Sequence, residues 1–319
     1  MIYTEICALL GIRYPILLAG MAGVSFADLT AAVSEAGGMG ILGAASLDPD
    51  RLREEIRKTK SLTHKPFGVD LLMAVPEMVQ EQIKVIFEEH IPVFVSGLAV
   101  PEGLIERAKK EGMKIISMVG KVAHALRAEA AGVDVIVAQG TEAGGHTGRI
   151  GTLALVPQVV DAVKIPVLAA GGIGDGRGLA AALAMGAKGV VMGTRFVASK
   201  EARATETYQN QILKAKDEDT VVTKCYTGKT LRAIRNAYTD RWERKADQIQ
   251  PFPLQAMASI ENNALSFVTT GEVRDPTREC MPCGQVCGMI EDVRGAREIV
   301  DQVIREAEKV MERWSPGGD

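Results

Sequence analysis

One histidine and four glycines lie close together in the segment Gln139-Gly140-Thr141-Glu142-Ala143-Gly144-Gly145-His146-Thr147-Gly148. Histidine titrates near neutral pH, so His146 could take up or release a proton during a reaction. Glycine has no Cβ atom, and a glycine-rich loop can therefore bring its backbone close to a ligand. We interpret this loop as part of a binding site and His146 as its candidate catalytic residue.

Two more glycine-rich loops, 171–176 and 193–195, each follow a short apolar run, as the first loop does. In parallel β/α proteins the carboxyl ends of the strands meet at one face, where ligands bind. In barrels, the loops after the last two strands often hold a phosphate with backbone N–H groups and the N-terminus of a short helix. The spacing therefore predicts a phosphate site at the two later loops.

The elements that must position these loops are short β-branched runs alternating with longer Ala-rich amphipathic runs. Eight strand candidates begin near Pro15, Met39, Pro66, Pro92, Lys114, Val133, Pro166 and Gly189. Their spacing of roughly 20–30 residues suits a βα unit. Eight such units predict an α/β protein with a TIM (β/α)₈ barrel, and a doubly wound open sheet is the alternative.

The alternating pattern breaks after the eighth strand candidate. Residues from about 201 to 270 are polar and helix-prone, with a basic cluster over 232–244 that is interpreted as a solvated helix face. We expect residues 1–200 and 287–319 to form the barrel, and residues 201–286 a small, mainly helical insertion or lid. The segment 296–314 is expected to supply the eighth outer helix.

Composition narrows the class of protein. The net charge is −3 and aromatic residues make up 4%, which argues against a nucleic-acid partner. No apolar run reaches the roughly 18 residues of a membrane span, and no secretory signal is visible. Five cysteines favour a reduced, cytoplasmic setting. We expect a small-molecule substrate and no membrane partner, and a homodimer remains open.

Three cysteines, Cys280, Cys283 and Cys287, have a spacing that could hold zinc or an iron–sulfur cluster. Either site usually needs a fourth ligand, and no second cysteine cluster lies nearby in the sequence. We therefore expect no metal, and the sequence assigns these thiols no role.

Several segments, in this order, match a known family. They include 14–16 with 20–25, 32–40, 66–70, 142–146, 169–173, 192–196 and 282–290. The chain resembles the FMN-dependent nitronate monooxygenases, formerly called 2-nitropropane dioxygenases, whose superfamily includes FMN-type enoyl-ACP reductases and NADH:quinone reductases. The resemblance runs from about residue 11 to residue 299.

The resemblance implies that FMN binds at the barrel mouth, with Ala19, Gly20 and Met21 along its ring and Gln139 near the ring or the ribityl chain. It implies a phosphate enclosed by Gly144, Ala170, Gly171, Gly172, Met192, Gly193 and Thr194. His146 would lie near the reactive edge of the flavin. Asp70 stands where the family often has asparagine, which puts redox tuning or substrate choice in doubt. Met118 and Lys121 fall in a loop where members differ, and either could face the cofactor.

The expected activity is oxidation of alkyl nitronates with O₂ to a carbonyl compound and nitrite. An NAD(P)H-dependent reductase of quinones or enoyl thioesters is the alternative, with NAD(P)H as co-substrate. A non-catalytic flavin- or phosphate-binding barrel is the third hypothesis. The sequence does not determine the physiological substrate, since pocket shape depends on several loops.

Overall fold

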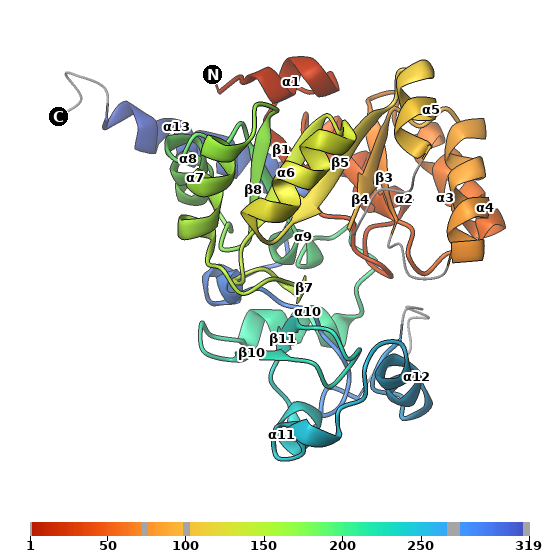
Figure 1. Ribbon diagram of the computed structural model, residues 1–319. Coiled ribbons are helices and arrows are strands. Elements are labelled where there is room, and N and C mark those ends of the chain that lie inside the picture. Colours follow the sequence, from red (N-terminus) through yellow and green to blue (C-terminus); the bar gives the residue numbers. More distant parts are fainter. Residues whose placement is uncertain (1, 72–75, 98–102, 267–274, 315–319) are drawn as a thin grey trace.

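Eight parallel strands form a closed barrel in the computed structural model, which describes residues 2–71, 76–97, 103–266 and 275–314 (Figure 1). The barrel strands are β1 (Ile16–Leu18), β2 (Gly40–Gly43), β3 (Phe67–Leu71), β4 (Val93–Ser96), β5 (Lys114–Val119), β6 (Val135–Gln139), β8 (Val167–Ala170) and β9 (Val190–Met192). They pair in the order β1-β9-β8-β6-β5-β4-β3-β2, and a parallel bridge between Leu17 and Met39 closes the ring. The predicted TIM barrel is confirmed, and the open sheet is excluded.

Helices cover the outside of the barrel. They are α2 (Ala27–Glu35), α3 (Pro49–Leu62), α4 (Pro76–Glu88), α5 (Leu104–Lys110), α6 (Val122–Ala131), α7 (Thr152–Ala162), α8 (Gly176–Ala184) and α13 (Ala296–Glu312). The last helix packs against α8 and α2, so the predicted eighth outer helix takes its place between them. Asp175 caps α8 by accepting hydrogen bonds from the amides of Arg177 and Gly178.

The barrel interior is filled by alternate residues of each strand, because side chains of a strand point to opposite faces in turn. Leu17, Ile41 and Leu168 belong to the interior cluster, whereas Ile16 and Leu18 pack in the layer between strands and helices. The short helix α1 (Glu5–Leu10) contributes to the interior cluster and closes the N-terminal end of the barrel (Figure 1). The carboxyl end is left for a site.

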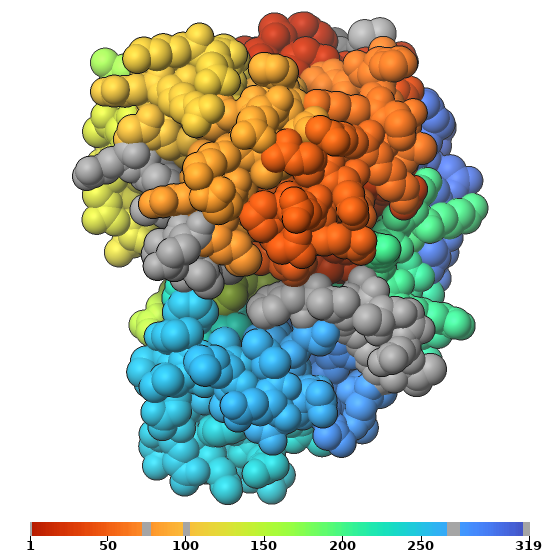
Figure 2. All heavy atoms as spheres, turned by 90° about the vertical axis from the view of Figure 1, so that its right-hand side faces the viewer, coloured from red at the N-terminus to blue at the C-terminus, as the bar shows by residue number. Residues whose placement is uncertain are grey.

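A separate unit lies at the carboxyl end of the barrel, as Figures 1 and 2 show. It contains α10 (Glu206–Lys214), α11 (Ala237–Glu243), α12 (Leu254–Glu261) and the 3₁₀ helices η1 (Ala246–Gln248) and η2 (Gln285–Met289). It also contains a hairpin of β10 (Thr220–Thr223) and β11 (Leu231–Ile234), which the helix-prone composition did not predict. Each strand has only four residues and neither alternates strictly between apolar and polar positions, so the surrounding helix-prone residues dominate a sequence window.

The insertion is tied to the barrel by a shared sheet. Strand β7 (Gly145–His146), in the loop after β6, pairs antiparallel with β11. The short helix α9 (Thr194–Val197) follows β9, and Val197 belongs to an apolar cluster with Ile212 and Met281 of the insertion. Within the described residues, no helix is long and apolar enough to cross a membrane.

Candidate functional site

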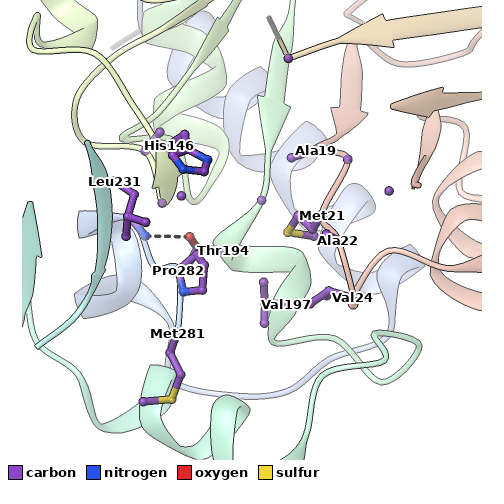
Figure 3. Close-up of a pocket in the computed structure, with 18 of the residues that line it drawn as sticks. Ala19, Met21, Ala22, Val24, His146, Thr194, Val197, Leu231, Met281 and Pro282 are labelled. Atoms are coloured by element: carbon purple, nitrogen blue, oxygen red, sulfur yellow. Dashed lines mark hydrogen bonds between the residues drawn. The ribbon is translucent and has the colours of Figure 1, made fainter. Parts of the chain in front are cut away.

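The mouth of the barrel opens into a cavity of about 330 Å³ between the strand ends and the insertion (Figure 3). Each barrel strand contributes one residue, at or just beyond its carboxyl end, to the floor of this cavity. The floor residues are Ala19, Gly43, Asp70, Gly97, Met118, Gln139, Ala170 and Val191. Half of them are alanine or glycine, so the floor leaves room for a flat ligand.

The loop after β8 offers backbone donors to the cavity. Gly171 and Gly172 have φ values of +90° and +72°, which favour glycine. A Cβ atom on Gly171 would lie 2.9 Å from the carbonyl oxygen of Gly140. Among the described residues, the amides of Gly171 and Gly172 donate no hydrogen bond. These amides, beside the start of α9 at Thr194, form an arrangement suited to a phosphate.

A second wall of the cavity is built by close backbone packing. The Oγ1 atom of Thr194 accepts a hydrogen bond from the amide of Gly284 at 2.9 Å, drawn in Figure 3. A Cβ atom on Gly144 would lie 2.8 Å from the backbone of Cys283. Gly144 is therefore needed for the approach of the segment around residue 283, whatever it does for a ligand.

His146 is held in place by both the barrel and the insertion. Its backbone carbonyl accepts a hydrogen bond from Gln139 Nε2 at 2.8 Å, and its ring Nε2 lies 3.0 Å from Thr227 Oγ1. The side chain is open to the cavity, yet the surrounding protein desolvates the ring. This burial and the nearby charge of Lys229 lower the pKa of His146 below its ordinary value. The ring is therefore neutral near pH 7 and able to accept a proton.

Asp70 places a carboxyl group on the floor of the cavity. It lies directly against Gly20, where an added Cβ atom would sit 2.2 Å from the Asp70 Cβ. No donor among the described residues makes a hydrogen bond to the Asp70 carboxylate, and burial alone shifts its pKa. Burial raises the pKa of Asp70 from 3.8 to about 7. The group thus changes charge around neutral pH, which the asparagine expected at this position could not do.

We predict that Asp70 makes folding stability depend on pH. The folded protein keeps the Asp70 proton up to about pH 7, whereas the unfolded chain releases it near pH 4. Protonated Asp70 therefore contributes to the free energy of unfolding at pH 4, and this contribution is lost as the pH rises from 4 to 7. Thermal unfolding measured from pH 5 to pH 8 should show that the stability of Asp70→Asn falls less with rising pH than that of wild type. At pH 8 the variant should be the more stable of the two. Equal pH slopes for the two proteins would contradict the prediction.

The structure brings together nearly all the residues singled out in the sequence. His146 lines the cavity, as do the predicted cofactor-binding residues Ala19, Gly20, Met21, Asp70, Gln139, Gly144, Ala170, Gly171, Gly172, Gly193 and Thr194. Met192 is not among the lining residues, because it faces the layer between strands and helices and is 1% exposed. Met118 was expected in a loop, but it lies within β5 and lines the cavity, whereas Lys121 lies beyond the strand, is exposed and does not line it. Their roles toward a cofactor stay predictions.

Other lining residues were not found from the sequence. Gly43, Gly97 and Val191 belong to the floor, and counting alternate positions along each strand would have found them. Tyr208 and Met281 come from the insertion. The Tyr208 hydroxyl donates a hydrogen bond to the carbonyl of Pro282. No local signal could reveal these two, since their place depends on how the insertion folds back.

Two interpretations of the insertion can be compared with the structure. Arg232 was assigned to a solvated helix face, and this is wrong, because it lies in β11 and is 7% exposed. Its guanidinium donates hydrogen bonds to the carbonyl of Thr141 and to the Thr220 hydroxyl, both at 2.9 Å.

Within the described residues, no group of three or more His, Cys, Asp or Glu side chains is arranged to hold a metal ion.

Comparison with known proteins gives consistent results. A family model described as nitronate monooxygenase matches residues 4–81 and 72–306. A probable nitronate monooxygenase of Staphylococcus saprophyticus is 34% identical, covering 97% of this chain and 99% of the relative. The structure of FabK from Thermotoga maritima is similar with a TM-score of 0.90 and 37% identity, covering 98% of this chain and 99% of FabK. The structure of a nitroalkane oxidase from Streptomyces ansochromogenes is similar with a TM-score of 0.89 and 28% identity, and the match covers 98% of this chain and 100% of the oxidase chain.

The fold and site define an FMN-dependent oxidoreductase, in which a barrel mouth with free loop amides is placed beside an imidazole. The family match spans nearly all of the chain, and relatives above 30% identity cover it almost completely. The chain belongs to the nitronate monooxygenase family. The hypothesis of a non-catalytic barrel is set aside.

Proposed function

We propose that this protein oxidises alkyl nitronates with O₂, giving a carbonyl compound and nitrite. The observation that carries the proposal is His146, a neutral imidazole that is open to the cavity and fixed at its backbone by Gln139 and β11. The similarity to proteins named probable nitronate monooxygenase and nitroalkane oxidase supports the same reaction.

The cavity has the features that FMN needs. The free amides of Gly171 and Gly172 and the N-terminus of α9 would hold its phosphate. The glycine-rich and alanine-rich floor would accept the flat ring, with Ala19 and Gly20 along it. FMN, when bound, would supply the electron transfer between the substrate and O₂.

The residues of the chain would bind the substrate and move its proton. A neutral nitroalkane must lose a proton from the carbon next to the nitro group to become a nitronate, and His146 would accept that proton. The imidazolium formed would attract the nitronate anion. Asp70 is mostly protonated below pH 7 and would then not repel this anion. Above pH 7 its carboxylate would oppose nitronate binding.

An absorbance spectrum and a nitrite assay test this function directly. We expect the purified protein to be yellow, or to become yellow with added FMN, and to release nitrite from a preformed alkyl nitronate in air. We expect NADH and NADPH to leave the flavin absorbance unchanged under nitrogen. A yellow protein that releases no nitrite and is bleached rapidly by either nucleotide would refute the proposal.

The second candidate is an NAD(P)H-dependent reductase of a quinone or an enoyl thioester. The similarity to FabK, at 37% identity over 98% of the chain, favours this branch. Under this function the same anaerobic experiment gives the opposite result, with rapid bleaching by NADH or NADPH. Adding a quinone or an enoyl thioester would then restore the yellow colour.

A further inference from the structure

The hydroxyl of Thr227 makes three polar contacts in the insertion. Its Oγ1 atom lies 3.0 Å from His146 Nε2, 3.2 Å from the carbonyl oxygen of Lys229 and 3.2 Å from the amide nitrogen of Lys229. Thr227 is only 5% exposed, so these groups rather than water must satisfy the hydroxyl.

A threonine hydroxyl has one hydrogen to donate and two lone pairs that accept. The Lys229 carbonyl can only accept, and the Lys229 amide can only donate. All three contacts are satisfied together only if the Thr227 hydrogen points to the carbonyl and the oxygen accepts from both the amide and His146 Nε2. The neutral ring then carries its proton on Nε2.

We propose that Thr227 is a positioning residue that fixes the Nε2–H tautomer of His146 and leaves Nδ1 as the proton-accepting atom toward the cavity. Nδ1 has no hydrogen-bond partner in the part of the chain that the structure describes, and the His146 side chain is open to the cavity. The tautomer assignment stands on the hydrogen-bond geometry. Its effect on turnover rests on the proposed nitronate chemistry.

The turn that presents Thr227 is itself held firmly. Gly228 has φ = +78°, and a Cβ atom there would lie 2.6 Å from the carbonyl oxygen of Gln250. The Lys229 ammonium lies 4.2 Å from the ring centre of Phe252, a cation–π contact that holds the turn to the next segment. His146 pairs with Leu231 of the following strand. The insertion thus sets both the backbone and the ring of His146.

The test compares Thr227→Val, which keeps the side-chain shape without the hydroxyl, with Thr227→Ser, which keeps the hydroxyl. Histidine ¹⁵N NMR of the FMN-loaded protein, with the His146 signals assigned by their loss in His146→Asn, reports which nitrogen carries the proton. We expect Nε2–H in wild type and Thr227→Ser, and a mixture of tautomers in Thr227→Val. A neutral hydrogen bond biases such an equilibrium by up to about tenfold. With wild type mostly Nε2–H, losing such a bias lowers the population of this tautomer by about two- to fivefold, so we expect kcat/KM for a neutral nitroalkane to fall by about that factor in Thr227→Val and kcat/KM for a preformed nitronate to stay unchanged.

A proton on Nδ1 in wild type would overturn the proposal, and this measurement does not depend on whether the valine variant folds. So would a Thr227→Val protein with wild-type tautomer and rates. If wild type carries the proton on Nε2 but does not turn over nitroalkanes or nitronates, the positioning role stands and the proposed function fails.

Discussion

Replacement of His146 by asparagine is expected to lower kcat/KM for a neutral nitroalkane by about 10²–10³-fold, the usual contribution of a general base. Asparagine retains a polar side chain but cannot accept the substrate proton. FMN content should stay unchanged, because the proposed phosphate donors are Gly171, Gly172 and the start of α9. Steady-state nitrite release and the flavin absorbance of the purified variant measure the two effects.

The preformed nitronate provides the control for this experiment. It has already lost its proton, so His146→Asn should slow its oxidation by about tenfold at most, through lost attraction for the anion. His124→Asn, on the outer helix α6, should behave as wild type. In wild type, kcat/KM for the nitroalkane should rise with pH to a plateau, with the midpoint of the rise below pH 6.5, because the pKa of His146 is lowered. Equal losses with nitroalkane and nitronate would contradict a role as base.

Replacement of Gly171 by alanine should nearly abolish FMN binding. Its φ of +90° costs an L-residue about 1–2 kcal/mol. The new Cβ atom would lie 2.9 Å from the Gly140 carbonyl and 3.0 Å from the Ala143 amide, and such crowding costs about 1–3 kcal/mol. The loop can relieve the unfavourable φ and the crowding only by moving the amides that face the phosphate. We expect FMN affinity to fall by at least about 30-fold, measured by fluorescence titration of the stripped protein.

Gly112→Ala is the matched control for this change. Gly112 also has a positive φ, +73°, but an added Cβ atom meets no atom within 4 Å. It lies between α5 and β5, away from the cavity. This variant should lose about 1 kcal/mol of stability and bind FMN as wild type does. If both variants bind FMN equally well, the loop after β8 does not hold the phosphate.

The barrel could be predicted because its signals are local. Each unit repeats a short apolar run and a helix, three of the runs end in a glycine-rich loop, and the glycine at 171 marks a backbone shape that other residues avoid. The motif does not show that the Met192 side chain faces away from the cavity, because this follows only from the alternation of side chains along β9, where Val191 lines the cavity. The match of motifs alone does not contain that information.

The insertion was less predictable, for a physical reason. The strand β11 forms because it pairs with both β10 and the distant β7, and none of these three would be stable alone. Arg232 looked like a surface cation because its partners, Thr141 and Thr220, lie 91 and 12 residues away and neither is marked by a motif. The partner of His146, Thr227, lies 81 residues away and carries no motif of its own.

The three-stranded sheet that contains His146 also has a consequence for biosynthesis. A nascent chain that has left the ribosome as far as Met192 already contains all eight barrel strands, but β11, which pairs with the strand of His146, has not yet emerged. His146 can therefore be aligned for catalysis only after the β10–β11 hairpin has left the ribosome.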